Sequence, residues 1–334
     1  MKIWISNITK YKFFYFHLQL LFSLLIIVAL SAGCKTNTIA SRNTTINSTV
    51  STEYKIGTYN VRYKNNNDNR NGHAWNERLD GIIGIIKKYD FDIIGVQEPF
   101  EDQLNDMSAK LKGYQRFGVS DDAQPNSTSN HHHDIFYKND KFKLENWGSF
   151  WLAPGAPLEP PADLMTTAWG GKAKVCTWGK FKDLKTSHIF FVFNTHFYYA
   201  NETTRNNSAI LILDKIKEIA GGKAAIFMGD LNFTPQSSGY KILSNSSLLN
   251  DSYDMAVLNY PPDTSKHQTF NQWHTDPGLI ANKKHKGRID YIFLTEHWKN
   301  KVIRSEIIWD TYVKDSLLKM PSDHNPVMLV LEKL

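Results

Sequence analysis

The sequence predicts an α/β protein in which mixed or antiparallel β-sheets are flanked by helices. Short apolar runs typical of strands alternate with segments whose apolar residues recur at helical spacing. A wholly parallel sheet gathers its ligand groups at the carboxyl ends of its strands, so polar residues at both ends of strands argue against that class. These residues are Asn60, Glu98, His196 and Asp230 at strand exits, and Asp290 and the pair Asp323-His324 at strand entrances.

The N-terminus has the pattern of an export signal. Three lysines precede the apolar segment 13–30, and small residues lead from there to Cys34. This pattern resembles the lipobox of bacterial lipoproteins, which implies a signal peptide over residues 1–33 and a membrane anchor through lipid on Cys34. The expected location is the bacterial cell envelope. A single transmembrane anchor is the alternative, since the segment is nearly long enough to span a bilayer.

The rest of the chain is expected to be a tether and one domain. Residues 34–53 are rich in Thr, Asn and Ser and hold almost no large apolar side chain, which predicts a flexible tether after the lipidated cysteine. Residues 54–334 are long enough for one domain with a large core. Cys176 then has no intramolecular partner, which excludes a disulfide framework. Without residues 1–33 the formal charge falls from +6 to +3, too little to indicate nucleic acid by itself.

Periodicity and turn residues place the elements of this domain. The first half is expected to contain a strand over 54–61, an amphipathic helix from Trp75 to Ile86, a strand within 92–99, a polar loop over 120–130, two or three strands within 135–151 and a Pro-rich loop over 154–161. The second half is expected to contain paired strands over 174–182 and 189–193, a helix over 202–220 ended by two glycines, and strands over 225–228, 289–294, 302–309 and 327–331.

The strand before Asp230 ends in two polar residues that share a face. Asp230 and Asn232 lie two residues apart, so in extended chain their side chains point the same way. The carboxylate can accept a proton or bind a cation, and the carboxamide can donate and accept hydrogen bonds. A plain turn is the alternative, because Asp and Asn are common turn formers and Thr234-Pro235 follows. Asn194 and His196 share a face in the same manner.

Six short motifs occur in a characteristic order. They are Gly57-Thr58-Tyr59-Asn60-Val61-Arg62, Gly95-Val96-Gln97-Glu98, Asn194-Thr195-His196, Gly229-Asp230-Leu231-Asn232, Arg288-Ile289-Asp290-Tyr291-Ile292 and Ser322-Asp323-His324-Asn325-Pro326-Val327. Together they resemble the endonuclease/exonuclease/phosphatase family over residues 55–331. The resemblance implies the fold of deoxyribonuclease I, a four-layer αββα sandwich of two mixed β-sheets flanked by helices. Trp75 with Arg78 and the passages 150–152 and 177–178 are most similar to the secreted bacterial branch.

The resemblance also implies a metal-dependent site. Phosphoester hydrolysis needs charge neutralisation, a base that activates water, and help for the departing oxygen. Glu98 and Asp323 are the expected oxygen ligands of Mg²⁺ or Mn²⁺, with Asn60 as a neutral neighbour, which matches the one or two carboxylates that Mg²⁺ usually takes.

Five further residues are expected to do the proton and phosphate chemistry. The resemblance assigns Asp290 to orient His324, which contacts the phosphate or activates the nucleophile. Asp230 orients or deprotonates water, and Asn232 holds a phosphate oxygen. His196 donates a hydrogen bond to the phosphate or protonates the leaving group. The base is either Asp230 or His324.

Each of these residues also has a purely structural explanation. Glu98 could cap a helix that begins near Glu101, Asp290 could be a charge at a strand edge, and Ser322-Asp323 could be an N-cap or a turn. Such explanations must coincide six times in the family's order, which favours the functional one.

Two departures from the family's pattern concern substrate recognition. The row His131-His132-His133-Asp134 stands where related proteins have a Gly-Glu sequence, and Lys174 stands where an Arg is usual. Consecutive histidines cannot all face one ion, so an exposed loop is expected there rather than a metal site. The basic residues 283–286, just before Arg288, could bind a phosphate-rich substrate or be solvated.

The expected activity is hydrolysis of a phosphoester by water. A phosphodiesterase or nuclease acting on nucleic acid or nucleotides is the first expectation. The alternative is a hydrolase of phospholipids or sugar phosphates, either sphingomyelinase-like or a phosphomonoesterase, and a catalytically silent binding lipoprotein is a third possibility. No motif points to an obligate protein partner. Fold alone does not decide among these substrates.

Overall fold

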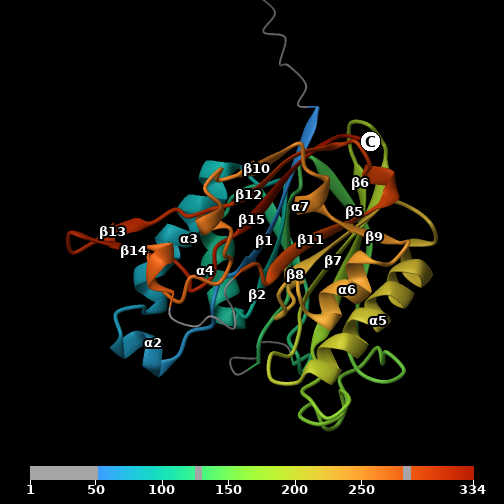
Figure 1. The fold of residues 1–334 in the computed structure, drawn as a ribbon, viewed down its shortest axis with the longest axis horizontal. Helices are drawn as coiled ribbons and strands as arrows, with labels where there is room; N and C mark the ends of the chain where they lie inside the picture. Colours follow the sequence, from blue (N-terminus) through green and yellow to red (C-terminus); the bar gives the residue numbers. More distant parts are fainter. Residues whose placement is uncertain (1–51, 125–129, 281–286) are drawn as a thin grey trace, which may run out of the picture. The chain divides into compact units, whose positions relative to one another are not determined.

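Two β-sheets packed face to face form the middle of the domain, as the computed structural model shows (Figure 1). The structure describes residues 52–124, 130–280 and 287–334, and residues 51–334 form one compact unit. The predicted signal peptide, Cys34, nearly all of the tether and the basic loop 283–286 lie outside the described residues. Among the helices that are described, none is long and apolar enough to cross a membrane.

Both sheets are mixed, as the sequence predicted. In described chain, the first sheet has the order β10 (Leu258–Tyr260), β12 (Val302–Ile307), β15 (Val327–Glu332), β1 (Glu53–Asn60), β2 (Ile93–Gln97), β4 (Ile135–Lys138) and β3 (Tyr114–Phe117). The second has the order β5 (Phe142–Trp151), β6 (Val175–Asp183), β7 (Ile189–His196), β8 (Ala225–Asp230), β11 (Asp290–Thr295) and β9 (Leu249–Asp251). In each sheet a parallel pair, β1 with β2 or β7 with β8, adjoins antiparallel strands.

Helices cover the outer face of each sheet and complete the four layers (Figure 1). The helices are α2 (Asn66–Arg70), α3 (Trp75–Tyr89), α4 (Glu101–Lys110), α5 (Glu202–Ala220), α6 (Ser238–Ser244) and α7 (Ser252–Met255). Helix α5 has the predicted limits because Asn201 caps its first turn and Gly221 adopts the left-handed conformation that ends it. The αββα sandwich predicted from the sequence is therefore confirmed.

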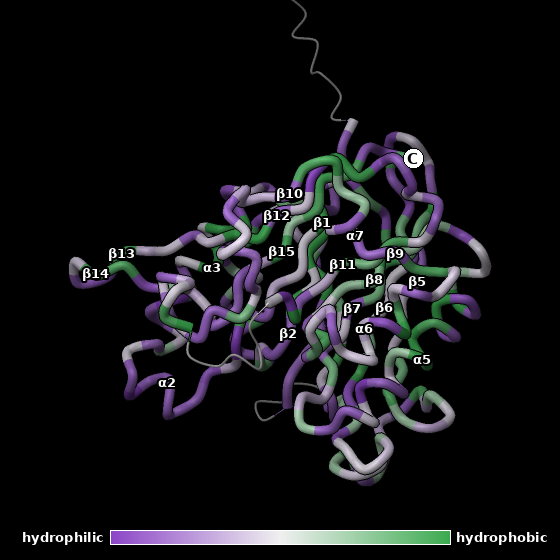
Figure 2. The backbone as a smooth tube through the Cα atoms, viewed as in Figure 1, coloured by the Kyte–Doolittle hydropathy of each residue, from purple (hydrophilic) through white to green (hydrophobic). Residues whose placement is uncertain are grey.

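The hydrophobic core has three main parts, and the strands carry most of its apolar residues (Figure 2). Between the sheets, Ile56 and Ile93 of the first sheet belong to one cluster with Ile226 and Met228 of the second. Outside them, α3 packs on the first sheet and α5 on the second. Full burial of one such Ile or Leu side chain contributes about 1.5–3 kcal/mol, so the parallel strands can end in polar residues without loss of the fold.

A polar bridge between the sheets fixes the two parallel strand pairs near their exits. Asn194 of β7 donates hydrogen bonds to the carbonyls of Val96 and Asp134, and its oxygen accepts one from Gln97 at 2.6 Å. A Cβ on Gly95 would lie 2.5 Å from that oxygen, so only glycine allows this approach. The bridge places the exit of β2 beside the exit of β7.

Several small elements carry weak local signals and were not predicted. They include α2, α6, α7, β3, β9, β10, the hairpin β13 (Tyr312–Lys314) with β14 (Leu317–Lys319), and short 3₁₀ turns at Thr264–Lys266, Pro277–Leu279 and Glu296–Trp298. Strands of three or four residues are too short to show a period, so their existence depends on pairing with longer neighbours. The predicted strand at 302–309 is real but ends at Ile307.

Candidate active site

The predicted polar residues converge at one rim of the sandwich. The register of the second sheet pairs His196 with Asp230 and Asp230 with Asp290, so three adjacent strands bring these side chains together. In the first sheet, Asn60 at the end of β1 pairs with Gln97, next to Glu98. Strand entrances and exits therefore meet, as the mixed sheets require.

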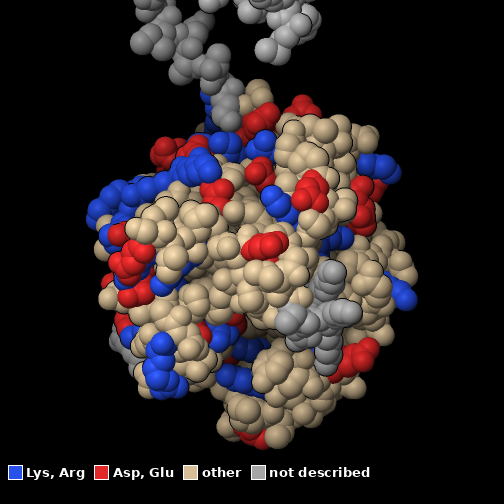
Figure 3. All heavy atoms as spheres, turned by 60° about the vertical axis from the view of Figure 1, so that its left-hand side comes forward, with Lys and Arg blue, Asp and Glu red and all other residues tan. Residues whose placement is uncertain are grey.

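A pocket of about 520 Å³ opens at this rim. Figure 3 shows the domain hollowed at this end, with basic side chains visible inside the hollow. Predicted site residues line the pocket together with aromatic and basic side chains: Arg62, Tyr63, Glu98, His131, Met165, Lys172, Lys174, His196, Phe197, Tyr198, Tyr199, Asp230, Asn232, Phe270, Ile289, Asp323 and His324. The other two predicted residues, Asn60 and Asp290, contact this lining from behind.

The backbone turns sharply where three of the strands end. Arg62, Glu98 and Asn232 have φ angles of 59°, 76° and 52°, a conformation that side chains other than Gly rarely adopt. Such strain is concentrated at functional sites, because surrounding structure must hold it. At Gly229, a Cβ would lie 1.9 Å from the carbonyl oxygen of Thr195, so the residue before Asp230 must be glycine.

Asn60 connects the two acids that face it. Its amide nitrogen donates to Glu98 Oε1 at 3.1 Å and to Asp230 Oδ2 at 3.0 Å, and its oxygen accepts from the backbone N–H of Arg62. In this conformation Asn60 offers donors, not an oxygen, to the carboxylates. That Asn60 lies next to a metal stays a prediction. In the structure its side chain holds the carboxylates of Glu98 and Asp230 close together.

Arg62 lies among three acids that sequence reasoning did not connect with it. Its guanidinium is 2.9 Å from Asp68, 3.4 Å from Asp323 and 4.0 Å from Glu98. Buried Arg78 supports this loop by donating to the carbonyls of Val61, Arg62 and Pro321. Together the two arginines tie the exit of β1 to the loop that carries Asp323 and His324.

His324 is held between two buried carboxylates. Its Nδ1 donates to Asp290, 3.0 Å and 3.2 Å from the two oxygens, and its Nε2 lies 3.7 Å from Asp230 Oδ2. Burial favours the neutral ring, but Asp290 and Asp230 outweigh it and raise the pKa of His324 to about 10. The imidazole is therefore positively charged at neutral pH.

Asp230 is the shared neighbour of the site. Its Oδ1 accepts from the backbone N–H of Asn232, and its Oδ2 is close to Asn60 and both imidazoles. Burial, followed by repulsion from Asp290, raises the pKa of Asp230 to about 8. Near neutral pH this group can therefore take up or give up a proton.

His196 is a neutral imidazole, unlike His324. Its Nε2 is 2.8 Å from the amide nitrogen of Asn232, which also donates to the carbonyl of Phe197, and 3.3 Å from Asp230. Burial, followed by the positive charge of Lys174, lowers the pKa of His196 well below its usual value. The ring is therefore uncharged at neutral pH.

The row of histidines is not the exposed loop that the sequence predicted. His132 and His133 are buried, and they turn to separate partners, Asp134 at 3.2 Å and Asp121 at 3.0 Å. His131 points into the pocket and packs on Tyr63 with ring centroids 4.6 Å apart. The prediction failed because the loop folds against the exit of β2, where the His132 N–H donates to the carbonyl of Pro99.

A basic wall next to these histidines includes one residue that the sequence had singled out. Lys174 contacts buried Asp121 at 2.8 Å, and Lys172 lies 3.3 Å from the same carboxylate. Burial opposes the charge on Asp121, but Lys174 and His133 outweigh it and hold the pKa of that carboxyl well below its usual range. Two lysines against one acid leave this wall positively charged, which suits an anionic ligand.

The donor set fits a divalent cation. Glu98 has carboxylate oxygens at the pocket, and Glu98, His131 and His196 can each offer a ligand atom within 4.8 Å of the others. Asp230, Asp290 and His324 form a second group with the same spacing. Asp323 lines the pocket but pairs with Arg62, so its predicted role as a metal ligand stays a prediction.

Comparison with known proteins gives the same family that the motifs indicated. A model of the "Endonuclease/Exonuclease/phosphatase family" matches residues 57–324. The chain is similar to a solved family member from Bacteroides thetaiotaomicron, with 32% identity, 84% of this chain and 97% of that chain covered, and a TM-score of 0.73. A search among curated proteins found no match.

Two further solved structures are informative. A mannosyl-6-phosphatase from Bacteroides thetaiotaomicron is 32% identical, with 83% of this chain and 98% of that chain covered and a TM-score of 0.72. The human nocturnin catalytic domain is 20% identical, with 83% and 92% covered and a TM-score of 0.61, and it supports the fold alone.

Proposed function

The chain belongs to the endonuclease/exonuclease/phosphatase family, and we propose on that premise that it is a Mg²⁺- or Mn²⁺-dependent hydrolase of small phosphorylated substrates such as sugar phosphates. All the activities in the family's name hydrolyse phosphate esters. The observation that carries the proposal is the pair formed by Asp230 and positively charged His324 at a pocket of about 520 Å³.

In this proposal Asp230 is the base that activates water. Its raised pKa of about 8 gives it more affinity for a proton than an exposed carboxylate has, and a general base works best with a pKa near the working pH. His324 has a pKa of about 10, so its imidazolium already holds the proton that a base would have to remove. This difference in pKa supports Asp230 over His324 as the base that the sequence left open.

His324 then binds the phosphate as a cation. Its Nε2 N–H lies toward Asp230 at the pocket, while Asp290 holds the other side of the ring and keeps it charged. Such a fixed charge stabilises the negative charge that grows on the phosphoryl oxygens in the transition state. His196 is neutral, so it supplies a hydrogen bond to the phosphate or the leaving oxygen, and Asn232, which would have to release one of its two present contacts to bind a phosphate oxygen, positions the ring.

A divalent cation bound at Glu98 would neutralise phosphate charge and polarise the bond to phosphorus. Glu98 is the ligand that we propose for it, with Asn60 holding the carboxylate in place. Arg62, paired with Glu98 and Asp323, adds a second positive charge at the same edge.

The pocket favours a small substrate. It has a volume of about 520 Å³, and aromatic residues including Tyr198 and Tyr199 line it together with Lys172. A sugar phosphate fits such a space, and the similarity to a mannosyl-6-phosphatase supports this class. The nuclease activity that the sequence favoured first stays a prediction, and so does a phospholipid substrate.

We further propose that the protein is an exported lipoprotein. The support is the lysine-flanked apolar segment that precedes Cys34. A lipid anchor would hold the domain at a membrane of the cell envelope.

Hydrolysis assays on the full chain test the proposal. We expect Mg²⁺- or Mn²⁺-dependent release of phosphate from mannose 6-phosphate and p-nitrophenyl phosphate that EDTA abolishes, with slower turnover of bis-p-nitrophenyl phosphate and single-stranded DNA. His324→Gln should be inactive, whereas His188→Gln, which changes an exposed histidine, should match the parent. If none of these substrates is hydrolysed, the protein would instead be a catalytically silent binding protein. If DNA is cleaved faster than the sugar phosphate, the nuclease activity expected first from the sequence would be correct.

A further inference from the structure

We propose that Glu98, His131 and His196 form a cation site with two nitrogen ligands, which binds a transition metal such as Zn²⁺ or Co²⁺ in preference to Mg²⁺. This inference rests on the proposed function and refines it: Mg²⁺ or Mn²⁺ would still support hydrolysis at Glu98, but a transition metal would bind more tightly, with His196 as its ligand instead of a donor to the phosphate. Metal binding can be measured without turnover. The sequence had pointed only to oxygen ligands, and it placed His131 in an exposed loop.

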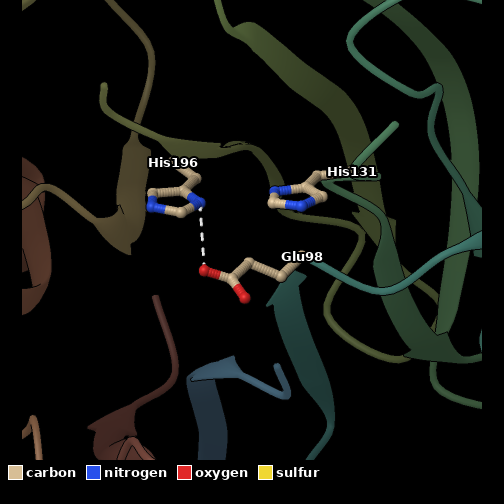
Figure 4. Close-up of side chains that lie close together, drawn as sticks. All are labelled: Glu98, His131 and His196. Carbon is tan, nitrogen blue, oxygen red and sulfur yellow. Dashed lines mark ion pairs between the residues drawn. The ribbon is translucent and has the colours of Figure 1, made fainter. Parts of the chain in front are cut away.

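The three side chains come from separate segments and face a common space, as Figure 4 shows. Glu98 follows β2, His196 ends β7, and His131 precedes β4. Their potential ligand atoms lie within 4.8 Å of one another, and His196 Nδ1 is 3.9 Å from Glu98 Oε1. Ligands at about 2.0–2.2 Å from one ion lie roughly 3–4 Å apart, so side-chain movements of about 1 Å would close the site.

Both imidazoles have a nitrogen without a partner. Nδ1 of His131 and Nδ1 of His196 are buried and make no hydrogen bond to any residue that the structure describes. Buried polar atoms in folded proteins normally have a partner, and exceptions often mark an ion or a functional role. His196 is only 6% exposed, so solvent cannot easily supply that partner.

The surroundings of His196 resemble the support that metal-bound histidines usually have. A ligating imidazole commonly donates its other ring N–H to a carboxylate. Nε2 of His196 lies 3.3 Å from Asp230 Oδ2, so a proton on Nε2 would have an acceptor when Nδ1 binds the metal. The amide nitrogen of Asn232, 2.8 Å from Nε2, could then no longer donate to the ring and would keep only its hydrogen bond to the carbonyl of Phe197.

His131 is held in position for the same purpose. Its ring packs against Tyr63 and Phe100, with centroids 4.6 Å and 5.9 Å away, and its carbonyl accepts from the N–H of Asp121. Its Nδ1 makes no hydrogen bond to any described residue, so this atom is available to bind a metal.

The other acid and histidine group is less suited to such an ion. Nδ1 of His324 is already hydrogen-bonded to Asp290, and the ring is positively charged. Imidazole ligands suit Zn²⁺ and Co²⁺, whereas Mg²⁺ prefers oxygen. The nitrogen ligands therefore select the class of metal, and they do so at Glu98.

Metal titrations of the full chain test the inference. Co²⁺ binding is followed by its visible absorption, and Zn²⁺ and Mg²⁺ binding by calorimetry, in the parent, His131→Gln and His188→Gln. We expect His131→Gln to bind Co²⁺ and Zn²⁺ at least about tenfold more weakly, with Mg²⁺ affinity changed less than twofold. The exposed His188 is a matched control for adventitious binding, so His188→Gln should behave as the parent does.

Pulsed EPR of the Mn²⁺-loaded protein reports the ligands directly. We expect nitrogen coupling from two imidazoles in the parent, from one in His131→Gln, and from none in the variant that also carries His196→Gln. His131→Asn provides a second, smaller substitution, and thermal unfolding confirms that each variant is folded.

Unchanged Co²⁺ affinity in both folded His131 variants, or a parent without nitrogen coupling, would overturn the inference. In that case Mg²⁺-dependent hydrolysis would leave the proposed function standing. If the bound metal shows nitrogen coupling but no phosphoester is hydrolysed, the metal site would stand and the proposed function would fail.

Discussion

Two of the three described histidines that line the pocket, His196 and His324, are buried alike but differ in charge. His196 is 6% exposed and His324 is 5% exposed, and both lie within 4 Å of the same oxygen of Asp230. His324 Nδ1 contacts both oxygens of Asp290, and its pKa rises to about 10. His196 Nδ1 makes no hydrogen bond to any described residue, since Glu98 Oε1 is 3.9 Å away, and burial together with Lys174 lowers the pKa of His196.

This difference suits the two rings to different roles in the proposed reaction. A carboxylate on the far side of the ring makes His324 a permanent cation, suited to hold a phosphate. Burial and then the charge of Lys174, with no carboxylate of the described residues in hydrogen-bond contact with Nδ1, keep His196 neutral, suited to donate a hydrogen bond or to bind a metal. Asp230 lies between them and serves as the base of the proposed reaction.

Removing the Asp230 carboxylate should reduce activity most, because both His196 and His324 contact it. We expect Asp230→Asn to lower kcat by about 10²–10⁴-fold, the usual contribution of a general base, while the fold is kept. The measurement is steady-state hydrolysis of mannose 6-phosphate together with thermal unfolding. Asp315→Asn makes the same chemical change in the exposed β13–β14 turn and should leave kcat unchanged. Equal kcat values for the two variants would exclude Asp230 as the base.

Removing Asp290 should make His324 resemble His196. In Asp290→Asn the ring loses the carboxylate that contacts its Nδ1, so we expect the pKa of His324 to fall. A lost hydrogen bond to a charged group is worth about 1.5–3 kcal/mol, which corresponds to a loss of about 10- to 100-fold in kcat/KM. Titration of the His324 ring proton by NMR checks the pKa. A pKa that stays near 10 would mean that Asp230 alone keeps the ring charged.

The parent should also show a bell-shaped dependence of kcat/KM on pH. Activity should rise as Asp230 loses its proton near pH 8 and fall as His324 loses its proton near pH 10. In Asp290→Asn the alkaline limb should move to lower pH, and the acid limb should move the same way because Asp290 also raises the pKa of Asp230. If Asp290→Asn does not shift the alkaline limb, deprotonation of His324 is not the cause of that limb.

The two histidines should contribute to stability in opposite directions. His324 has a raised pKa in the fold, so its contribution is complete below pH 6.5 and is lost as the pH rises through about 10. His196 has a lowered pKa, so its burial costs stability at acid pH and the cost disappears as the pH rises to about 6.5. Each proton changes stability by at most about 1.4 kcal/mol per pH unit.

Urea unfolding from pH 5 to pH 10 measures these contributions. His324→Gln should remove part of the stability loss above pH 7, and His196→Gln should flatten the curve below pH 6.5. If stability depends on pH in the same way in the two variants, His324 and His196 do not have opposite charge states in the folded protein.

The smallest effect is expected from Lys172, the outer lysine of the basic wall. Lys172→Gln leaves Lys174 paired with Asp121, so folding should be little affected. A partly exposed charge contributes about 0.2–1 kcal/mol, so KM for mannose 6-phosphate should rise about 1.5- to 5-fold at unchanged kcat. The exposed Lys185 provides a matched control in Lys185→Gln. A larger change in kcat than in KM would place Lys172 in the chemistry.

Much of the fold is readable along the chain because its signals are local. Helix α5 was predicted with both ends, since its cap, its apolar stripe and its closing glycine are neighbours in sequence. Mixed sheets followed from polar residues at both entrances and exits of strands. The short strands β3, β9 and β10 could not be predicted, because three or four residues show no period.

The sequence by itself determined which polar residues stand at strand ends, and their order identified the family. Only the tertiary structure decided their chemistry. The carboxylate of Asp290, which keeps His324 positively charged, is 34 residues away from it in the sequence, and Lys174 is 53 residues away from its partner Asp121. It also turned His131 into the pocket and placed Arg62 between Glu98 and Asp323. A pKa or a ligand geometry depends on distances of a few ångströms between distant segments, which packing of the two sheets sets and local sequence does not record.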